Sequence, residues 1–246
     1  MGFRIKHIFH QNALQPKLPY IAMVLILTSV LSVISMIVTL TLSLLNGEFK
    51  TNTCITIFAG VFNIIGFFLG MMLVILQKMR ETFPLNIIML ILYGLAVSAA
   101  QGYSIINVEV PVKAIAWVIA FVLLSILVPI GFVIKTDLSQ YTSVFIIYCV
   151  AELSTIMVAF LGLIIAGYTQ VALAVFVAGA FPILIPLAIG FGQLIFGTSF
   201  SYTYNPDYCL ASLTLFTTLL GFFISISVEG HFITRLIKNN TIVKLL

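Results

Sequence analysis

Residues 208–228 read YCLASLTLFTTLLGFFISISV, and they belong to a stretch, residues 136–234, that contains no lysine and no arginine. Two further long apolar segments lie in the same stretch, at residues 141–167 and 171–196. A soluble domain normally needs charged residues for about a quarter of its chain to cover its surface. The stretch therefore predicts helices that span a membrane.

The composition of the whole chain agrees with this prediction. Of its 246 residues, 62% are hydrophobic and 7% are charged, and the mean hydropathy is +1.24. A net charge of +4 would suggest a nucleic-acid partner in a soluble protein. Here the basic residues lie beside apolar segments, where they act as topology signals. We therefore expect the lipid bilayer to surround the chain, and we expect no nucleic-acid partner.

Four more apolar segments come earlier in the chain, at residues 20–45, 54–76, 85–106 and 114–134. Each of the seven segments is longer than the roughly 20 residues that a helix needs to cross the hydrocarbon core. Barrel strands would need only about 10 residues of alternating polarity, and backbone groups in lipid must find internal partners. We predict an all-α membrane protein, a seven-segment transmembrane helical bundle. The bundle covers residues 20–228, between an N-terminal tail at 1–19 and a C-terminal tail at 229–246.

The positions of the basic residues leave two topologies open. If all seven segments cross, the two sides of the membrane receive six and five basic residues. If one of the last two segments enters and returns on the same side, the count becomes nine against two, which the positive-inside rule prefers. The sequon at residues 239–241 could be glycosylated only if the C-terminal tail were lumenal.

Glu152 is the acidic residue that falls in the middle of a predicted segment. An ionisable residue at membrane depth costs about 2.5–3.5 kcal/mol on insertion scales and is a functional hypothesis by default. Glu152 could line an ion path or carry a proton. The alternative is a neutral carboxyl group that is hydrogen-bonded to a neighbouring helix.

Other polar and irregular positions carry structural expectations. The large amides are expected to form hydrogen bonds between helices; they are Asn63, Asn86, Gln101 and Gln193. Small residues four apart should let helices pack closely; the pairs are Gly66/Gly70, Ala96/Ala100 and Gly162/Ala166. Pro182 and Pro186, followed by two glycines, make residues 181–193 the most deformable helix. Broken helices often lie where permeating species bind, and irregular packing alone is the alternative.

We expect no enzyme activity, no metal site and no cofactor. His7 and His10 lie in the N-terminal tail, and His231 follows the last segment. The three cysteines lie in or beside apolar segments without the spacing of metal ligands. A catalytic site needs a nucleophile and a base within reach of each other, and the sequence offers no such pair.

Three stretches of the chain are similar to a known family. RETFPLNII at residues 80–88, followed by LILYGLAVSAAQG, resembles the Lifeguard branch of the Bax inhibitor-1 family. KTDLSQYTS at residues 135–143 looks like the family's short loop before the fifth span. GQLIFG at residues 192–197, then NPDY and ASLTLF, is similar to the family's junction between the sixth and seventh spans. The resemblance covers about residues 58–228, and the order and spacing of the motifs carry it.

The resemblance implies a fold, a function and a pair of gating residues. The implied fold is a seven-segment bundle with the last helix central. The implied location is an internal membrane such as the endoplasmic reticulum or the Golgi. The function is suppression of cell death together with calcium leak, and paired aspartates on the sixth and seventh helices sense pH. This chain has Phe191 and Thr218 at those positions. A phenyl ring and a hydroxyl cannot share a proton or bind calcium as carboxylates do, so we do not expect the pH gating to carry over.

Two functions are therefore predicted. The first is a regulator of cell death and calcium content that acts as a cation leak, with calcium ions as its partner. In this hypothesis Glu152 is a substitute cation site, Thr218 and Gln193 line the path, and Phe191 is a plug or gate. The second is a non-conducting scaffold that acts by binding other membrane proteins.

Overall fold

A computed structural model describes residues 18–44, 52–76, 78–79, 82–134, 142–196 and 208–238. The helices in these ranges are α2 (Leu18–Leu44), α3 (Asn52–Ile75), α5 (Leu85–Ser104), α6 (Val110–Val133), α7 (Thr142–Ile165), α8 (Thr169–Ala178), α9 (Phe181–Phe196) and α10 (Tyr208–Lys238). No strand occurs in the described ranges. Seven spans in them are long and apolar enough to cross a membrane, and the sixth runs across α8 and α9. The predicted all-α fold with seven membrane segments is thus confirmed, and the chain is an integral membrane protein.

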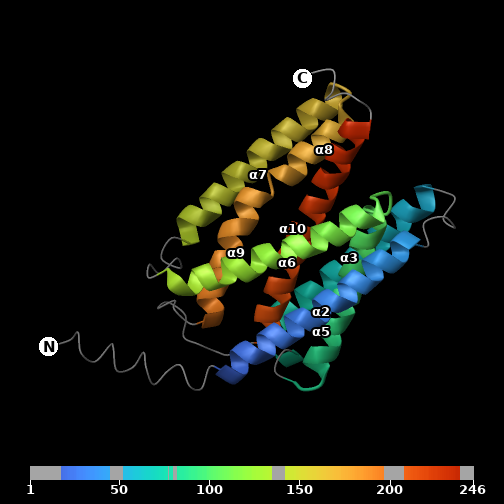
Figure 1. Ribbon diagram of the computed structural model, residues 1–246. Coiled ribbons are helices and arrows are strands. Elements are labelled where there is room, and N and C mark those ends of the chain that lie inside the picture. Colours follow the sequence, from blue (N-terminus) through green and yellow to red (C-terminus); the bar gives the residue numbers. More distant parts are fainter. Residues whose placement is uncertain are drawn as a thin grey trace.

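The helices form two groups with a pair of helices between them (Figure 1). Helix α5 packs against α2 and α3 on one side of the molecule, and α7 packs against α8 on the other. Helices α6 and α10 lie between these groups, and α10 packs against α2, α5, α6, α8 and α9. The last described helix is therefore the central one, as the resemblance implies.

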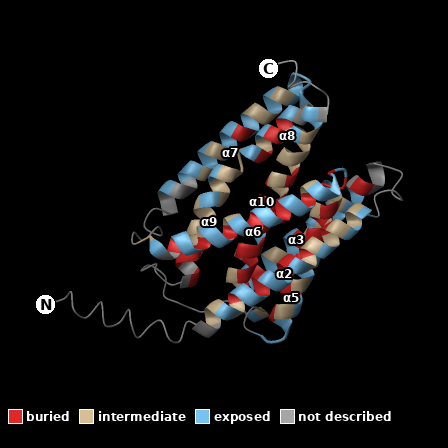
Figure 2. Cartoon of the chain, viewed as in Figure 1, coloured by how far each residue is buried: buried red, intermediate tan, exposed pale blue. Residues whose placement is uncertain are grey.

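Burial follows the same plan (Figure 2). The middle of α10 is enclosed, and Phe216, Leu219 and Phe222 are fully buried. Helices α3 and α7 expose most of their large apolar side chains, such as Phe67 at 63% and Val158 at 72%. Faces of this kind would be unstable in water, but lipid solvates them without cost. The apolar surface is therefore the lipid-facing surface of the bundle.

Two helices, α6 and α10, extend by four or more residues beyond the segments expected from hydropathy. Helix α6 begins at Val110 rather than near residue 114, because Pro111 occupies its first turn, where a missing N–H costs nothing. Helix α10 continues to Lys238, well beyond residue 228. Gly230 does not end it, since Gly230 lies within the helix against Val112 of α6. A hydropathy scan misses both extensions because they contain charged residues.

The sixth span is broken into α8 and α9. Gly179 forms the C-cap of α8, and α9 begins at Phe181. Pro182 is then the second residue of α9, where a missing N–H is tolerated, whereas Pro186 lies inside the helix. The break thus precedes residues 181–193, which the sequence predicts to be the most deformable part.

Helices α6 and α9 cross at unusually close range through a reciprocal pair of glycines. A Cβ atom built on Gly131 of α6 would lie 2.2 Å from the Ile189 carbonyl oxygen of α9. One built on Gly192 of α9 would lie 2.2 Å from the Val128 carbonyl oxygen of α6. Only glycine allows two helix backbones to approach so closely. Gly66 and Gly70 differ, because they meet side chains of α5, those of Val97 and Tyr93, and Gly162 has no neighbour within 4 Å.

Gly192→Ala should test the glycine crossing. We expect the free energy of unfolding to fall by roughly 1–3 kcal/mol, because the added methyl group meets backbone and the helices must separate. Thermal unfolding of the purified protein in detergent measures the change.

Gly190→Ala is the matched control on the same helix. A Cβ atom there meets nothing within 4 Å, and alanine favours a helix more than glycine does. This variant should be at least as stable as the parent chain. Equal losses in the two variants would contradict the close crossing.

Candidate functional site

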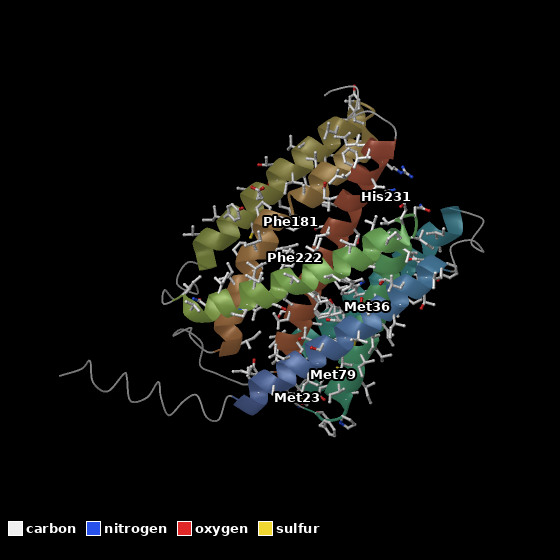
Figure 3. All side chains as sticks on the ribbon, in the orientation of Figure 1. Met23, Met36, Met79, Phe181, Phe222 and His231 are labelled. Atoms are coloured by element: carbon white, nitrogen blue, oxygen red, sulfur yellow. The ribbon has the colours of Figure 1, made fainter. Side chains whose placement is uncertain are left out.

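The interface between α9 and α10 holds the two positions at which the resembling family carries aspartates. Phe181 of α9 and Phe222 of α10 point toward one another, with ring centroids 5.8 Å apart (Figure 3). Leu184 of α9 lies against Gly221 of α10. Thr218 precedes Phe222 by one helical turn, so it lies on the same face of α10.

Helical spacing brings Phe191 to this interface as well. Phe191 follows Leu184 by seven residues, which is close to two helical turns and the same face of α9. Since α9 and α10 run in opposite directions here and Leu184 lies against Gly221, Phe191 lies at the level of Thr214, about one helical turn from Thr218. Phe191 and Thr218, two of the four predicted site residues, thus belong to one interface but lie at different levels of it.

Neither residue presents a polar group to an ion path. Thr218 is 4% exposed, and its hydroxyl donates to the Thr214 carbonyl oxygen of its own helix at 2.9 Å. Phe191 is half-buried and packs against the hydrophobic core. The place of the family's acid pair is therefore apolar and closely packed.

Gln193 and Glu152 lie elsewhere. The Gln193 side chain is buried, and its Nε2 donates to the Ile134 carbonyl oxygen at the end of α6, at 3.3 Å. Gln193 therefore anchors α9 to α6, as expected for a large amide in a helical bundle. Glu152 is half-buried on α7, which packs against α8 rather than against α10. The four predicted residues do not form one site.

Hydrogen bonds between α5 and α10 hold the central helix. Asn86 Nδ2 donates to the Tyr208 hydroxyl at 2.6 Å, as predicted for this amide. The Tyr93 hydroxyl and the Thr217 Oγ1 atom lie 2.8 Å apart. Asn63 differs from the prediction, because its Nδ2 bonds the Ala59 carbonyl oxygen of its own helix at 3.0 Å.

Lys113 is the buried ionisable residue that the sequence does not reveal. It lies in the first turn of α6 and is 0% exposed. Its Nζ donates to Ser43 Oγ of α2 at 2.5 Å and to the Ile106 carbonyl oxygen at 3.4 Å. When basic residues are counted on the two sides of the membrane, Lys113 is assigned to a loop. In the structure it lies inside the bundle.

The surroundings explain why a charge is tolerated there. Ser43 belongs to the last turn of α2, and Ile106 comes just after the end of α5. The C-terminal end of a helix carries a partial negative charge, so a cation near two such ends is stabilised. Lys113 therefore joins α6 to the C-terminal ends of α2 and α5. This role is structural and needs no ligand.

A stripe of hydroxyls on α2 is the signal that could have identified this region. Threonine or serine recurs at helical spacing along one side of α2, at residues 28, 32, 35, 39 and 43, and the first four are buried. Trp117 of α6 donates from Nε1 to Thr39 Oγ1 at 3.2 Å and stacks on Phe223 of α10 at 4.3 Å. The stripe therefore marks the face of α2 that meets α6 and α10.

Glu229 and His231 lie toward the C-terminal end of α10. Figure 3 labels His231. The Glu229 Oε1 atom is buried and has no hydrogen-bond partner among the described residues. Across those residues, no group of three or more histidine, cysteine, aspartate or glutamate side chains could hold a metal ion.

Comparisons with protein-family models, with curated proteins and with solved structures gave no match to this chain.

Lys113→Glu should test the junction of α2, α5 and α6. The substitution puts a carboxylate beside carbonyl oxygens and the negative ends of two helices. We expect the free energy of unfolding to fall by roughly 3 kcal/mol or more, as for other uncompensated buried charges. Lys78→Glu makes the same charge change at an exposed position and should leave stability nearly unchanged. Similar melting temperatures for the two variants would count against the assigned role of Lys113.

Proposed function

We propose that the chain is a multi-pass membrane regulator of cell death and calcium content in an internal membrane, the endoplasmic reticulum or the Golgi. In this proposal it acts as a cation leak that the paired acids of the Bax inhibitor-1 family do not gate. The resemblance over residues 58–228 supplies the functional class. The observation that carries the proposal is the central position of α10, which packs against α2, α5, α6, α8 and α9.

The absence of acid gating in the proposal follows from Phe191 and Thr218. Acid gating by the family's route needs two carboxyl groups that can exchange a proton across the α9–α10 interface. Here the Thr218 hydroxyl is already bonded within its own helix, and Phe191 has no proton to exchange. A leak through this chain would therefore depend on Glu152, on α7.

A non-conducting scaffold is the second candidate. The tightly packed interface at Thr218 and the close crossing of α6 and α9 favour it, because neither leaves a polar path along the central helix. In this case the exposed faces of α3 and α7 would bind other membrane proteins.

Flux of calcium, monovalent cations and protons through liposomes that contain the purified chain separates these candidates. The leak hypothesis expects flux that does not change when one side is acidified, because the gating carboxyl pair is missing. Glu152→Gln should lower the flux, whereas Glu229→Gln, an equal change of charge on α10, should not.

Restoring the acid pair provides the reciprocal test. Phe191→Asp combined with Thr218→Asp places two carboxyl groups in the α9–α10 interface, where a like charge and burial raise the pKa of a carboxyl group, so this variant should introduce a response to acid. Flux in the parent chain that already responds to acid would contradict the proposed ungated leak. Parent liposomes as tight as empty ones, together with co-purification of a membrane protein, would select the scaffold.

A further inference from the structure

We infer that Glu152 and the backbone carbonyl groups at the break between α8 and α9 form a binding site for one monovalent metal cation, Na⁺ or K⁺. This inference deepens the proposed leak by naming the class of ion, and it rests on that proposal only for the movement of the ion across the membrane. Binding itself is a separate property that can be measured without flux.

The position of Glu152 follows from its two neighbours along α7. The Tyr148 hydroxyl, four residues earlier, donates to the Pro182 carbonyl oxygen at 3.4 Å. Ile156, four residues later, lies against Gly179, where a built Cβ atom would come within 2.5 Å of its side chain. Residues four apart share one face of a helix, so Glu152 lies in the middle of the face that both flanking residues turn toward the break.

Glu152 has no competing partner there among the described residues. Its side chain is half-buried rather than fully exposed to lipid. Within the described residues it makes no hydrogen bond or ion pair. Side chains of a helix lean toward its N-terminus, and this direction takes the carboxylate of Glu152 toward Tyr148 and Pro182. A carboxylate at this depth without a counter-charge is costly, so a cation there would stabilise it.

The break supplies neutral oxygen ligands. The Ile183 N–H donates to the Ala180 carbonyl oxygen at 3.1 Å, and no backbone donor reaches the carbonyl of Gly179 in this part of the chain. Pro182 has no N–H to offer to the Ala178 carbonyl, four residues earlier. Two carbonyl groups at the C-terminal end of α8 thus lose their usual helical partners. This end also carries the negative pole of the helix dipole.

Carboxylate and carbonyl oxygens are the ligands that hard metal cations prefer. In membrane proteins, the unwound carbonyls and half-helix ends of a broken helix are typical ligands for such ions. Here the carboxylate comes from α7 and the carbonyls from the sixth span, so a bound ion would tie the two helices together. Tyr148 already joins them at the next turn.

Charge balance selects a monovalent ion. Glu152 supplies one negative charge, and the described residues contain no cluster of acids that could add more. No lysine or arginine occurs between residues 136 and 234, so α7, α8 and α9 cannot neutralise the carboxylate themselves. One monovalent cation makes the site neutral, whereas a divalent ion would leave a net charge in apolar surroundings. A leak of monovalent cations would still affect the movement of calcium across the membrane. Calcium movement separates charge, and a flow of monovalent cations in the opposite direction balances that charge.

The melting temperature of the purified chain in detergent tests the site. Potassium chloride, sodium chloride or calcium chloride replaces N-methyl-D-glucamine chloride at constant ionic strength. A ligand that binds only the folded state raises the melting temperature, so we expect a concentration-dependent rise with potassium or sodium. Calcium at equal concentration should give a smaller rise.

Three variants locate the effect. Glu152→Gln should abolish the rise, and Pro182→Ala should reduce it by returning an N–H donor to the Ala178 carbonyl. Glu229→Gln removes an equal charge from α10 and should leave the rise intact. Pro182→Ala keeps the test decisive if Glu152→Gln fails to fold. A parent chain that does not respond, a full response in Glu152→Gln, or a larger response to calcium would overturn the inference.

Flux through liposomes distinguishes this site from the proposed function. If cations raise the melting temperature of the chain but the chain does not leak, the result supports the site and counts against the leak. If the chain leaks but cations do not raise its melting temperature, the result overturns the site and remains consistent with the leak.

Discussion

Lipid cannot hydrogen-bond, and the arrangement of this protein follows from that constraint. Hydroxyl, amide and charged side chains must find partners inside the bundle, while large apolar side chains can face outward. Helix α10 is rich in serine and threonine, and it lies at the centre with α2, α5, α6, α8 and α9 around it. Helices α3 and α7 are more exposed and turn apolar faces outward.

The same constraint distinguishes two regions of the bundle. Inside the bundle several polar groups have partners: Tyr93 meets Thr217, and Lys113 meets the ends of α2 and α5, whereas the buried Glu229 Oε1 atom has none among the described residues. The polar atoms in these contacts stabilise the bundle and are therefore not available to a ligand. At the edge of the bundle, α7 with Glu152 packs against the sixth span, whose own hydrogen bonds are interrupted by Pro182. A polar group is most available to a ligand where the surrounding structure does not already satisfy it.

Sequence alone predicts the fold well and the site only in part. Seven long apolar segments can be counted directly, because the membrane imposes a minimum length on each helix. The ends of α6 and α10 were missed, since their terminal turns contain charged residues whose burial depends on other helices. Lys113 is the clearest case. Nothing local distinguishes a lysine that anchors a helix at the membrane surface from one that is enclosed by two helix ends. The break before Phe181 was predicted approximately, because Pro182 and Pro186 mark it, but the face of α7 that meets it depends on packing.

The central position of α10 has a consequence for the biogenesis of the protein. A ribosome delivers helices in chain order, so α2 to α9 enter the membrane before residues 208–238 have been made. Until then Asn86 lacks the Tyr208 hydroxyl, and the Tyr93 hydroxyl lacks Thr217. The early helices must therefore wait, with polar groups unmatched, beside the insertion machinery or a chaperone that shields them. Closure of the bundle is then a late event of translation, and quality control can act on the half-assembled chain before its central helix arrives.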